Sequence, residues 1–266
     1  MIYDHTSHVG NAGDVWKHLI LTEAAHHLLI LDPHLLYAES HTGWREYSLP
    51  LVGEWKGGVG RLWPPAPELL QFPYFRILSR MNPEGLLRYP GSSQLVLNVA
   101  QELGVSLQAE LWDINPLLQR AWSQDFSPHL VSFHLGDGFG GVERLVEVSD
   151  PGLLLIDSPY TGQEDVEDSE DLFYKAATAG WTVLCWYMLD LDKTPRFRCP
   201  HQIHCLEFRR AGMDGGRWKG AGVAVASEDD QLSDWLAGRT ETFLLLCRSK
   251  IEHRKGKGAV AKGMNE

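Results

Sequence analysis

The sequence predicts a doubly wound α/β fold, in which helices cover both faces of a mostly parallel sheet. Four branched aliphatic residues occupy positions 153–156 after the turn pair Pro151-Gly152, and so short an apolar run indicates a strand buried on both faces. From residue 35 onward, strand patterns alternate with helical patterns everywhere except in residues 45–90, which is typical of parallel sheets. Predicted strands also end in acids such as Asp157. Open α/β sheets bind ligands at that edge, so we expect the functional site there.

The composition of the 266-residue chain is that of one folded domain with a substantial core, because 44% of its residues are hydrophobic. No apolar run approaches the roughly 20 residues that a membrane span requires, and polar residues occupy the amino-terminal segment. We therefore expect a cytoplasmic protein that does not contact membranes, with a monomer as the default. The formal net charge of −11 argues against non-specific coating of nucleic acid but leaves room for a local basic face.

The four cysteines lie in the last third of the chain, without the spacing of a disulfide scaffold or zinc ribbon. Two of them form a compact cluster of possible ligands with two histidines: Cys199, His201, His204 and Cys205. In a strand, His204 faces away from the other three, so we expect no metal site.

The run Asp157-Ser158-Pro159-Tyr160 places a carboxylate, a fixed turn and an aromatic ring directly after the predicted strand at 153–156. The exocyclic amine of adenine is a weak nucleophile because its lone pair is delocalised into the ring. Asp157 and the backbone carbonyl of Ser158 can each accept one N–H of that amine, and Tyr160 can stack on an extruded base, a contact worth about 1–3 kcal/mol. An ordinary turn after a strand is the alternative interpretation of the same run.

This tetrapeptide resembles the Asp/Asn-Pro-Pro-Tyr/Phe signature of amino-group methyltransferases that use S-adenosylmethionine. Ser158 stands where the signature has a proline, but its carbonyl remains, and Pro159 still favours extended geometry at Ser158. The resemblance implies that Asp157, Ser158 and Tyr160 are catalytic and that S-adenosylmethionine is the methyl donor. Because the donor is already a sulfonium cation, we expect transfer of its methyl group to need no metal.

The amino-terminal segment predicts a helix that Asp14 caps and that runs to about residue 30. Its buried positions are expected to include Val15, Leu19, Ala25 and Leu29. Lys17 lies in the first turn, where a positive charge is electrostatically misplaced, so we expect its side chain to reach a ligand or a carboxylate.

The same segment is similar to the amino-terminal signature His-Ala-Gly-Asn-x-Ala-Asp-Val-x-Lys-His of the RlmJ family, bacterial methyltransferases acting on adenine N6 of 23S ribosomal RNA. The matching positions are His8, Gly10, Asn11, Asp14, Val15, Lys17 and His18. The resemblance implies that this segment lines two pockets, with Lys17 and His18 at the donor and with substrate contacts from His5, His8 and Asn11. A satisfied core or capping histidine is the alternative for His18.

Residues 35–39 predict a second buried strand, and Ser40-His41-Thr42-Gly43 makes a turn at its carboxyl end. A glycine in such a turn lets the backbone approach a ligand closely. The turn resembles the family's Asp-Thr-His-Ala-Gly segment, with Glu39, His41 and Gly43 in register. The resemblance implies that His41 and Gly43 contact the donor.

Residues 45–90 contain seven prolines and five glycines and read as an insertion rather than a separate domain. We expect one short helix over 67–80. The RlmJ resemblance places a small helical subdomain here, suited to gripping the substrate.

The segment Tyr89-Pro90-Gly91-Ser92-Ser93 resembles the family's Tyr-Pro-Gly-Ser-Pro. Ser92 or Ser93 is expected to cap a helix over 94–103, whose exposed amides make an anion site. The carboxylate of the donor is the candidate occupant, which makes Ser92 a cofactor residue. A plain helix cap is the alternative.

Two acids follow the next predicted strands, over 105–112 and 130–134. Asp113 lies where Rossmann-type domains hold ribose hydroxyls, with Glu110 as the alternative, and a short helix over 116–122 follows it. Asp137 lies in the loop Gly136-Asp137-Gly138, where an acid in methyltransferase folds commonly contacts the adenine amine of the donor. A routine Gly-Asp-Gly turn is the alternative for Asp137.

The remaining sequence predicts an acidic helix from about 164 to 179 and strands over 181–188, 201–208 and 222–226. Trp186-Tyr187 resembles the family's Trp-Tyr at the end of its strand. The last residues, 250–266, form a basic segment that we expect to be a flexible tail.

These observations predict a single Rossmann-like methyltransferase domain, spanning 1–266 with the insertion at 45–90. The resemblance implies S-adenosylmethionine-dependent N6-methylation of an adenine in 23S ribosomal RNA, before ribosome assembly is complete. Two alternatives stay open. One is a homologue that binds the donor without catalysis, and the other is a methyltransferase acting on DNA or a small molecule.

Overall fold

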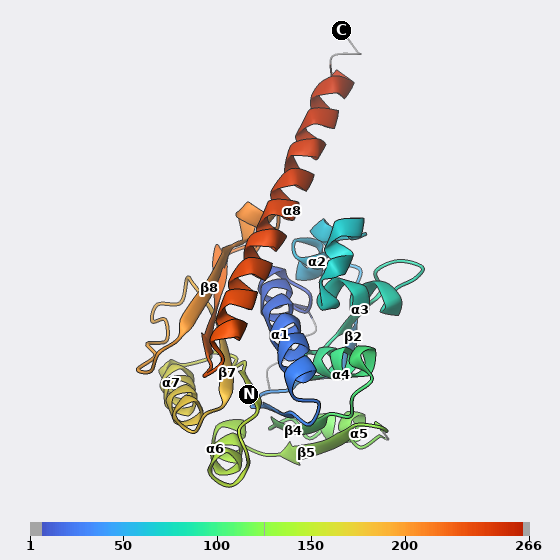
Figure 1. The fold of residues 1–266 in the computed structure, drawn as a ribbon. Helices are drawn as coiled ribbons and strands as arrows, with labels where there is room; N and C mark the ends of the chain where they lie inside the picture. Colours follow the sequence, from blue (N-terminus) through green and yellow to red (C-terminus); the bar gives the residue numbers. More distant parts are fainter. Residues whose placement is uncertain (1–6, 125, 263–266) are drawn as a thin grey trace.

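A seven-stranded sheet forms the centre of the computed structural model, which describes residues 7–124 and 126–262, with side chains up to residue 248 (Figure 1). The strand order is β5-β4-β1-β6-β7-β9-β8. The strands are β1 (Leu36–Glu39), β4 (Gln108–Asp113), β5 (Leu130–Leu135), β6 (Leu153–Ile156), β7 (Thr182–Met188), β8 (Gln202–Glu207) and β9 (Gly220–Ala226). The predicted α/β fold with a mostly parallel sheet is confirmed.

Five strands from β5 to β7 run parallel, and the chain reverses its direction across the sheet between β1 and β6. After β4 and β5 have been added on one side of β1, the chain returns so that β6 pairs with the other side of β1. Ligands of doubly wound sheets bind outside the carboxyl ends of the strands at such a switch point. The fold therefore points to the ends of β1, β4 and β6 as the site.

The far edge of the sheet departs from the predicted alternation, because β9 lies antiparallel between β7 and β8. No described helix separates β7, β8 and β9 except the short 3-10 turn Phe208–Ala211, whereas parallel strands are usually joined through a crossover α-helix. Burial agrees with the order: every residue of β9 is buried, whereas β8 alternates as an edge strand.

Helices cover both faces of the sheet, and β6 contributes side chains to both cores. Leu153 and Leu155 face the larger core, whereas Leu154 and Ile156 face the smaller one, because alternate strand residues point to opposite faces. The larger core includes side chains of α1 (Ala12–Leu31), α4 (Ser92–Leu103), α5 (Leu118–Trp122) and α8 (Asp230–Lys262). The smaller core includes side chains of α6 (Gly138–Val148) and α7 (Gln163–Thr178).

Helix α1 is buried along most of its length and includes the predicted core positions Val15, Leu19, Ala25 and Leu29. The predicted cap was wrong: Asn11 is the N-cap residue, and its side chain accepts a hydrogen bond from the backbone N–H of Asp14 at 2.9 Å. Asp14 therefore lies inside the first turn, which leaves its carboxylate for other partners.

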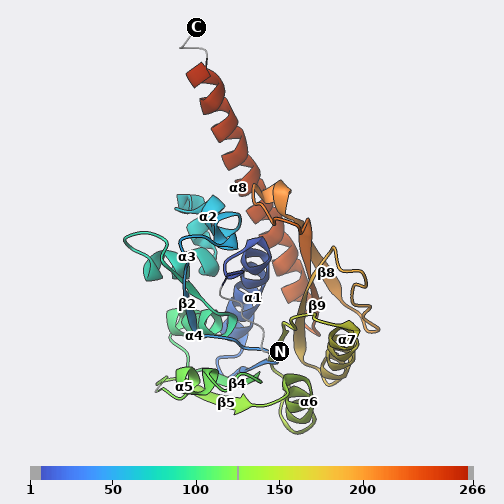
Figure 2. The same ribbon diagram turned by 180° about the vertical axis from the view of Figure 1, so that it is seen from behind.

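Residues 45–90 form short helices and a two-stranded antiparallel sheet (Figure 2). Their apolar side chains join the core around α1 and α4. Their elements are β2 (Glu46–Ser48), η1 (Glu54–Lys56), α2 (Val59–Leu62), η2 (Pro67–Gln71), α3 (Pro73–Met81) and β3 (Arg88–Pro90). The single helix expected over 67–80 is two, because a 3-10 helix ends at Gln71 and α3 begins at Pro73.

Helices α6 and α8 were not anticipated from the sequence. Helix α8 continues to Lys262, so it includes most of the segment expected to form a flexible tail, and its carboxyl-terminal part projects beyond the rest of the chain (Figures 1 and 2). None of the helices in the described part of the chain has both the length and the apolar character needed to cross a bilayer.

Candidate functional site

Asp157 follows the last residue of β6 and lies at the switch point, and its carboxylate is held by α1. Lys17 donates to Asp157 Oδ2 across 2.5 Å and lies 3.1 Å from Asp14 Oδ1. The side chains of Lys17 and Asp14 are 6% and 3% exposed, whereas that of Asp157 is 17% exposed. Asp157 is thus the member of this Asp14–Lys17–Asp157 cluster that remains accessible from the surface.

The cluster explains why a lysine occupies the first turn of α1. Burial by itself lowers the pKa of Lys17, but the adjacent carboxylates of Asp157 and Asp14 outweigh burial and raise that pKa above its ordinary value. The ammonium group also lies 5.2 Å from the ring centroid of Trp186, at the end of β7. The expectation that Lys17 reaches a carboxylate is confirmed, and its contact with a donor stays a prediction.

Asp14 contacts Lys17, and it also holds the backbone that leads into α1. Its Oδ2 accepts the backbone N–H of Gly10 at 2.8 Å, and Gly10 has a positive φ of 72°. Asp14 was predicted to be a helix cap, and its contact with Lys17 was not predicted. The available signal was the i, i+3 spacing of Asp14 and Lys17, which brings two side chains of a helix together.

Tyr160 is held by a hydrogen bond that fixes the position of its ring. Its hydroxyl donates to the backbone carbonyl of Trp186 at 2.7 Å and lies 3.4 Å from Cys185 Sγ. Among the residues that the structure describes, Tyr160 is the only non-glycine residue with a positive φ, 49°, a conformation that is costly for an aromatic residue and clusters at functional sites.

Ser158 is 1% exposed, and its hydroxyl lies 3.4 Å from the backbone nitrogen of Tyr160. Buried Ser158 and exposed Pro159 lie in the turn between β6 and α7. The structure thus brings Asp157, Ser158 and Tyr160 together at the end of β6, while their catalytic roles stay a prediction.

Glu39 ends β1 as a fully buried carboxyl group surrounded by hydroxyl donors. Tyr37 donates to its Oε2 at 2.7 Å, and Ser92 and Ser93 at the start of α4 donate to its two oxygens. Burial raises the pKa of Glu39 to about 7, partly offset by these hydroxyl donors.

This network changes the role expected for Ser92. Helix α4 begins at Ser92 with Gly91 as its N-cap residue and no side-chain cap, so the expectation of a serine cap before residue 94 was wrong. Because the Ser92 hydroxyl bonds to Glu39, a donor contact at this position would come from backbone N–H groups of the first helical turn.

The loop after β1 meets the end of β4. Gly43 donates its backbone N–H to Asp113 Oδ2 at 3.1 Å, and Asn115 donates its own to Asp113 Oδ1 at 2.8 Å. Gly43 has φ of 61°, and a Cβ there would lie 2.7 Å from the hydroxyl oxygen of Tyr47, so the turn requires glycine. His41 lies 4.9 Å from Phe139, centroid to centroid, and the desolvation of its half-buried ring lowers its pKa.

Asp137 is the N-cap residue of α6, and its carboxylate accepts the backbone N–H groups of Phe139 and Gly140 at 3.2 and 3.0 Å. The turn interpretation is therefore confirmed in the form of a helix cap, and contact with the donor adenine stays a prediction. Gly138 lies so close to Ser40 that a Cβ would overlap its carbonyl oxygen, which brings Asp137 to the loop after β1.

His18 lies in the core rather than at the surface of the site. It is 3% exposed, and its Nδ1 lies 3.0 Å from the hydroxyl oxygen of Tyr89, which in turn lies 2.9 Å from that of Tyr74. This position agrees with the alternative of a core histidine that has a hydrogen-bond partner, and contact of His18 with the donor stays a prediction.

Two of the three predicted substrate residues contact one glutamate of the insertion. His8 Nδ1 lies 2.9 Å from Glu54 Oε1, and the Asn11 side chain donates to Glu54 Oε2 at 3.2 Å. Asn11 also caps α1, so its substrate role stays a prediction. His5 lies outside the described residues.

Within residues 7–124 and 126–248, no three His, Cys, Asp or Glu side chains gather as metal ligands. His204 is buried in β8, whereas Cys205 is exposed, in agreement with the predicted divergence of their side chains.

The doubly wound sheet, the acids at the ends of β1, β4 and β6 and the aromatic turn after Asp157 define a Rossmann-like methyltransferase class. The model of one family, described as ribosomal RNA large subunit methyltransferase D, RlmJ, matches residues 32–196. The chain belongs to the RlmJ family, and the resemblance seen in its sequence is confirmed.

Two similar proteins carry the name ribosomal RNA large subunit methyltransferase J. The protein from Haemophilus influenzae is 30% identical over 202 residues, covering 70% of this chain and 69% of its own length. The protein from Escherichia coli is 31% identical over 218 residues, covering 77% and 75%. The crystal structure of protein LPL1258 from Legionella pneumophila has the same fold, with a TM-score of 0.69, 19% identity and coverage of 91% and 94%.

Proposed function

We propose that this protein transfers a methyl group from S-adenosylmethionine to N6 of an adenine in 23S ribosomal RNA. The observation that carries the proposal is the position of Asp157, a partly exposed carboxylate at the switch point, held by Lys17. The names of the relatives from Haemophilus influenzae and Escherichia coli support ribosomal RNA as the substrate. A cytoplasmic location, where such RNA is accessible, follows from the proposal.

The residues at the ends of β1 and β4 fit the methyl donor. Gly43 leaves no room for a side chain, so backbone lines this part of the crevice. Asp113 accepts two backbone N–H groups, and the two carboxylate oxygens still have lone pairs for ribose hydroxyls. The first turn of α4 offers backbone amides to the donor's carboxylate, and Asp137 would accept from its adenine. The bound donor supplies an electrophilic methyl group.

Asp157 and Ser158 would prepare the amine of the target adenine. The Asp157 carboxylate and the Ser158 carbonyl each accept one N–H, which draws the nitrogen toward tetrahedral geometry and frees its lone pair. Tyr160, fixed through its hydroxyl, stacks on the extruded base. These residues do little beyond positioning, and positioning is the main requirement of this transfer.

Lys17 places a positive charge beside Asp157 and holds its carboxylate in position to accept the amine N–H. Lys17 donates its hydrogen bond to Oδ2 of Asp157. The other oxygen, Oδ1, is the candidate acceptor for the substrate.

The proposal is tested by methylation of 23S ribosomal RNA taken from a strain that lacks this protein. Purified protein and donor labelled in the methyl group are added, and the modified nucleosides are mapped by mass spectrometry. We expect one N6-methyladenine in RNA. Donor binding without transfer would favour the non-catalytic alternative, and labelled DNA or small molecules with unlabelled RNA would contradict an RNA substrate.

A further inference from the structure

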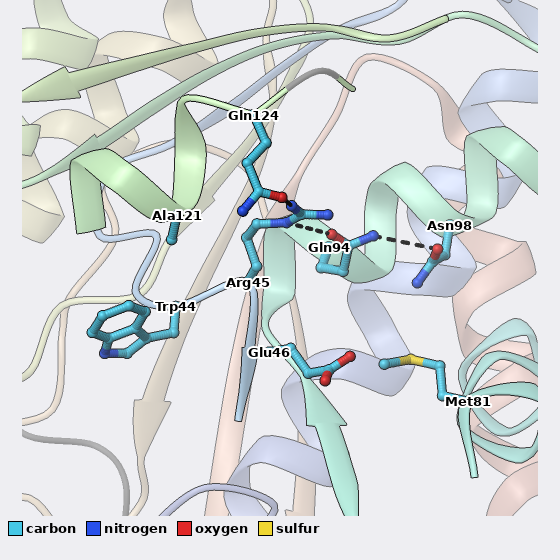
Figure 3. A pocket seen from close by; sticks show the side chains of 8 residues that line it. All are labelled: Trp44, Arg45, Glu46, Met81, Gln94, Asn98, Ala121 and Gln124. Carbon is cyan, nitrogen blue, oxygen red and sulfur yellow. Dashed lines mark hydrogen bonds between the residues drawn. The ribbon is translucent and has the colours of Figure 1, made fainter. Parts of the chain in front are cut away.

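A polar pocket lies outside the Asp157 site, where the insertion meets α4 and α5. Its volume is about 480 Å³, within the range of small-ligand sites. Figure 3 shows its side chains, which come from the segment 44–46, α3, α4 and α5 and the residue 124 that follows. None of them has a role in the methyl transfer proposed above.

Arg45 organises the polar side of the pocket. Its Nε donates to Gln94 Oε1 at 3.1 Å and its Nη1 donates to Gln124 Oε1 at 2.8 Å. Because a guanidinium group only donates, both amides must turn their oxygens toward Arg45. Gln94 then donates through its Nε2 to Asn98 Oδ1 at 3.3 Å.

This network engages the amide oxygens and leaves amide N–H groups as the donors available to a ligand. The amide oxygens of Gln94, Gln124 and Asn98 each accept a bond within the network, and Figure 3 shows the Gln124 and Asn98 nitrogens on the far sides of their amides. No described residue accepts from either nitrogen. The pocket therefore suits a ligand with oxygen or ring-nitrogen acceptors, such as a phosphate or the N7 and O6 edge of a purine.

Trp44 supplies an aromatic surface on the Ala121 side of the pocket, and Figure 3 shows its ring directed away from Gln94 and Asn98. Trp44 lines the pocket and is 37% exposed, which makes its indole available for stacking. The Arg45 guanidinium is held over Phe126, with Cζ 4.4 Å from the ring centroid. Glu46, the acid in the pocket, lies 3.5 Å from Arg88, so its charge is opposed.

The pocket is continuous with the loop that serves the proposed donor site. Trp44 and Arg45 directly follow Gly43, whose N–H bonds to Asp113 and whose carbonyl accepts from Trp122 of α5 at 2.9 Å. A ligand in the pocket would therefore lie beside the proposed donor site, on its β4 side.

We propose that this pocket binds an unpaired nucleotide of the RNA substrate other than the target adenine. The base of this nucleotide stacks on Trp44. The phosphate of the nucleotide, or the acceptor edge of its base, accepts hydrogen bonds from the Asn98 and Gln124 amides and from Arg45. The inference rests on the proposed function, since it assigns a further contact to the same substrate. Protein contacts of this kind are typical of single-stranded RNA, whose bases are free to stack on aromatic side chains.

The test compares four variants with the parent protein at one fixed salt concentration. The variants are Trp44→Ala, Asn98→Ala, Arg45→Lys and Gln101→Ala. The last is the matched control, because Gln101 is an exposed amide on α4 outside the pocket. The probe is unmodified 23S ribosomal RNA transcribed in vitro, with affinity measured by filter binding. Affinity for S-adenosylmethionine is measured by calorimetry, and methyl transfer to the transcript is measured in parallel.

We expect Trp44→Ala to weaken RNA binding about tenfold, because a base loses its stacking partner. Asn98→Ala should weaken it about three- to tenfold. Arg45→Lys should have a similar effect, since a lysine keeps the charge but cannot hold both amides in one plane. Gln101→Ala should bind RNA as the parent does, and all four variants should bind the donor normally.

Parental RNA affinity in Trp44→Ala and Asn98→Ala would overturn the inference, and so would a parallel loss of donor affinity, which would assign the pocket to the donor. These outcomes are distinguishable from failure of the proposed function, in which the parent itself transfers no methyl group to RNA.

Discussion

Lys17 Nζ lies 2.5 Å from Asp157 Oδ2, so the first helix of the chain directly contacts the acid at the end of the central strand. The two residues are separated by 139 intervening positions, and the doubly wound topology brings them together. Asp14 completes the cluster at 3.1 Å from the same ammonium group. One buried cation therefore supports two carboxylates, and its removal has consequences for both stability and activity.

Lys17→Met should lower the free energy of unfolding by about 3 kcal/mol, because it leaves the carboxylates of Asp14 and Asp157 without their cation. Methyl transfer should be lost as well. Urea denaturation measures the first effect, with the double variant Lys17→Met, Asp157→Ala as the control. If the pair interacts, the double variant loses less stability than the two single variants together; strict additivity would contradict the contact.

Glu39→Gln should remove a pH dependence from the stability of the protein. Burial raises the pKa of Glu39 to about 7 from its ordinary 4.5, so the folded protein retains a proton that the unfolded chain loses. The stability from this group is complete below about pH 4.5 and is lost as the pH rises through 7, by roughly 3 kcal/mol. Denaturation of both proteins at pH 5 and pH 8 isolates the difference, since Glu23, whose pKa is also raised by burial, is present in both. If the free energy of unfolding changed equally in both proteins between pH 5 and pH 8, Glu39 would be ionised in the folded state.

Tyr160 is expected to contribute through its ring more than through its hydroxyl. Tyr160→Phe loses the bond to the Trp186 carbonyl, worth about 0.5–1.5 kcal/mol, but keeps a ring for stacking. Tyr160→Ala should reduce kcat/KM for RNA at least tenfold. The steady-state kinetics of the two variants separate these effects, and a larger loss in Tyr160→Phe would assign the main role to the hydroxyl.

The pair Glu23–Arg239 joins α1 to α8, and its loss should destabilise the protein without affecting the site directly. Arg239 bonds both oxygens of Glu23 at 2.8 and 3.0 Å, and the Glu23 side chain is 1% exposed. Arg239→Met leaves a buried carboxylate without its partner, at a cost of about 3–5 kcal/mol. Thermal unfolding should show a lower Tm, with donor affinity unchanged below the transition. An unchanged Tm would mean that this pair does not join α1 to α8.

The central strand and its acid were predictable because both faces of β6 are buried and the run 153–156 is uniformly aliphatic. Helix α6 was not, because three of its first four residues are Gly138, Gly140 and Gly141, which disfavour a helix by propensity. Asp137 compensates through its cap. Local propensity was outweighed by a tertiary requirement, since a Cβ at Gly141 would collide with Trp112.

The positions of the site residues in the fold were predicted better than the groups that their side chains contact. Lys17 was expected to find a carboxylate, but the choice of Asp157 and Asp14 depends on contacts across the fold. Ser92 was expected at a helix start, and it lies there, yet its hydroxyl bonds to Glu39 on β1, 53 positions earlier. Sequence spacing shows which residues share a helix turn, but it does not show which strand end lies opposite.

The most direct test of the account is methyl transfer by Asp157→Ala. Asp150→Ala is the matched control, because Asp150 is an exposed acid just before β6, at the opposite end of the strand. Affinity for S-adenosylmethionine is measured by calorimetry and transfer to unmodified 23S ribosomal RNA by radiolabel. The account predicts that Asp157→Ala binds the donor and transfers no detectable methyl group, whereas Asp150→Ala does both. Transfer by Asp157→Ala at the parental rate would contradict it.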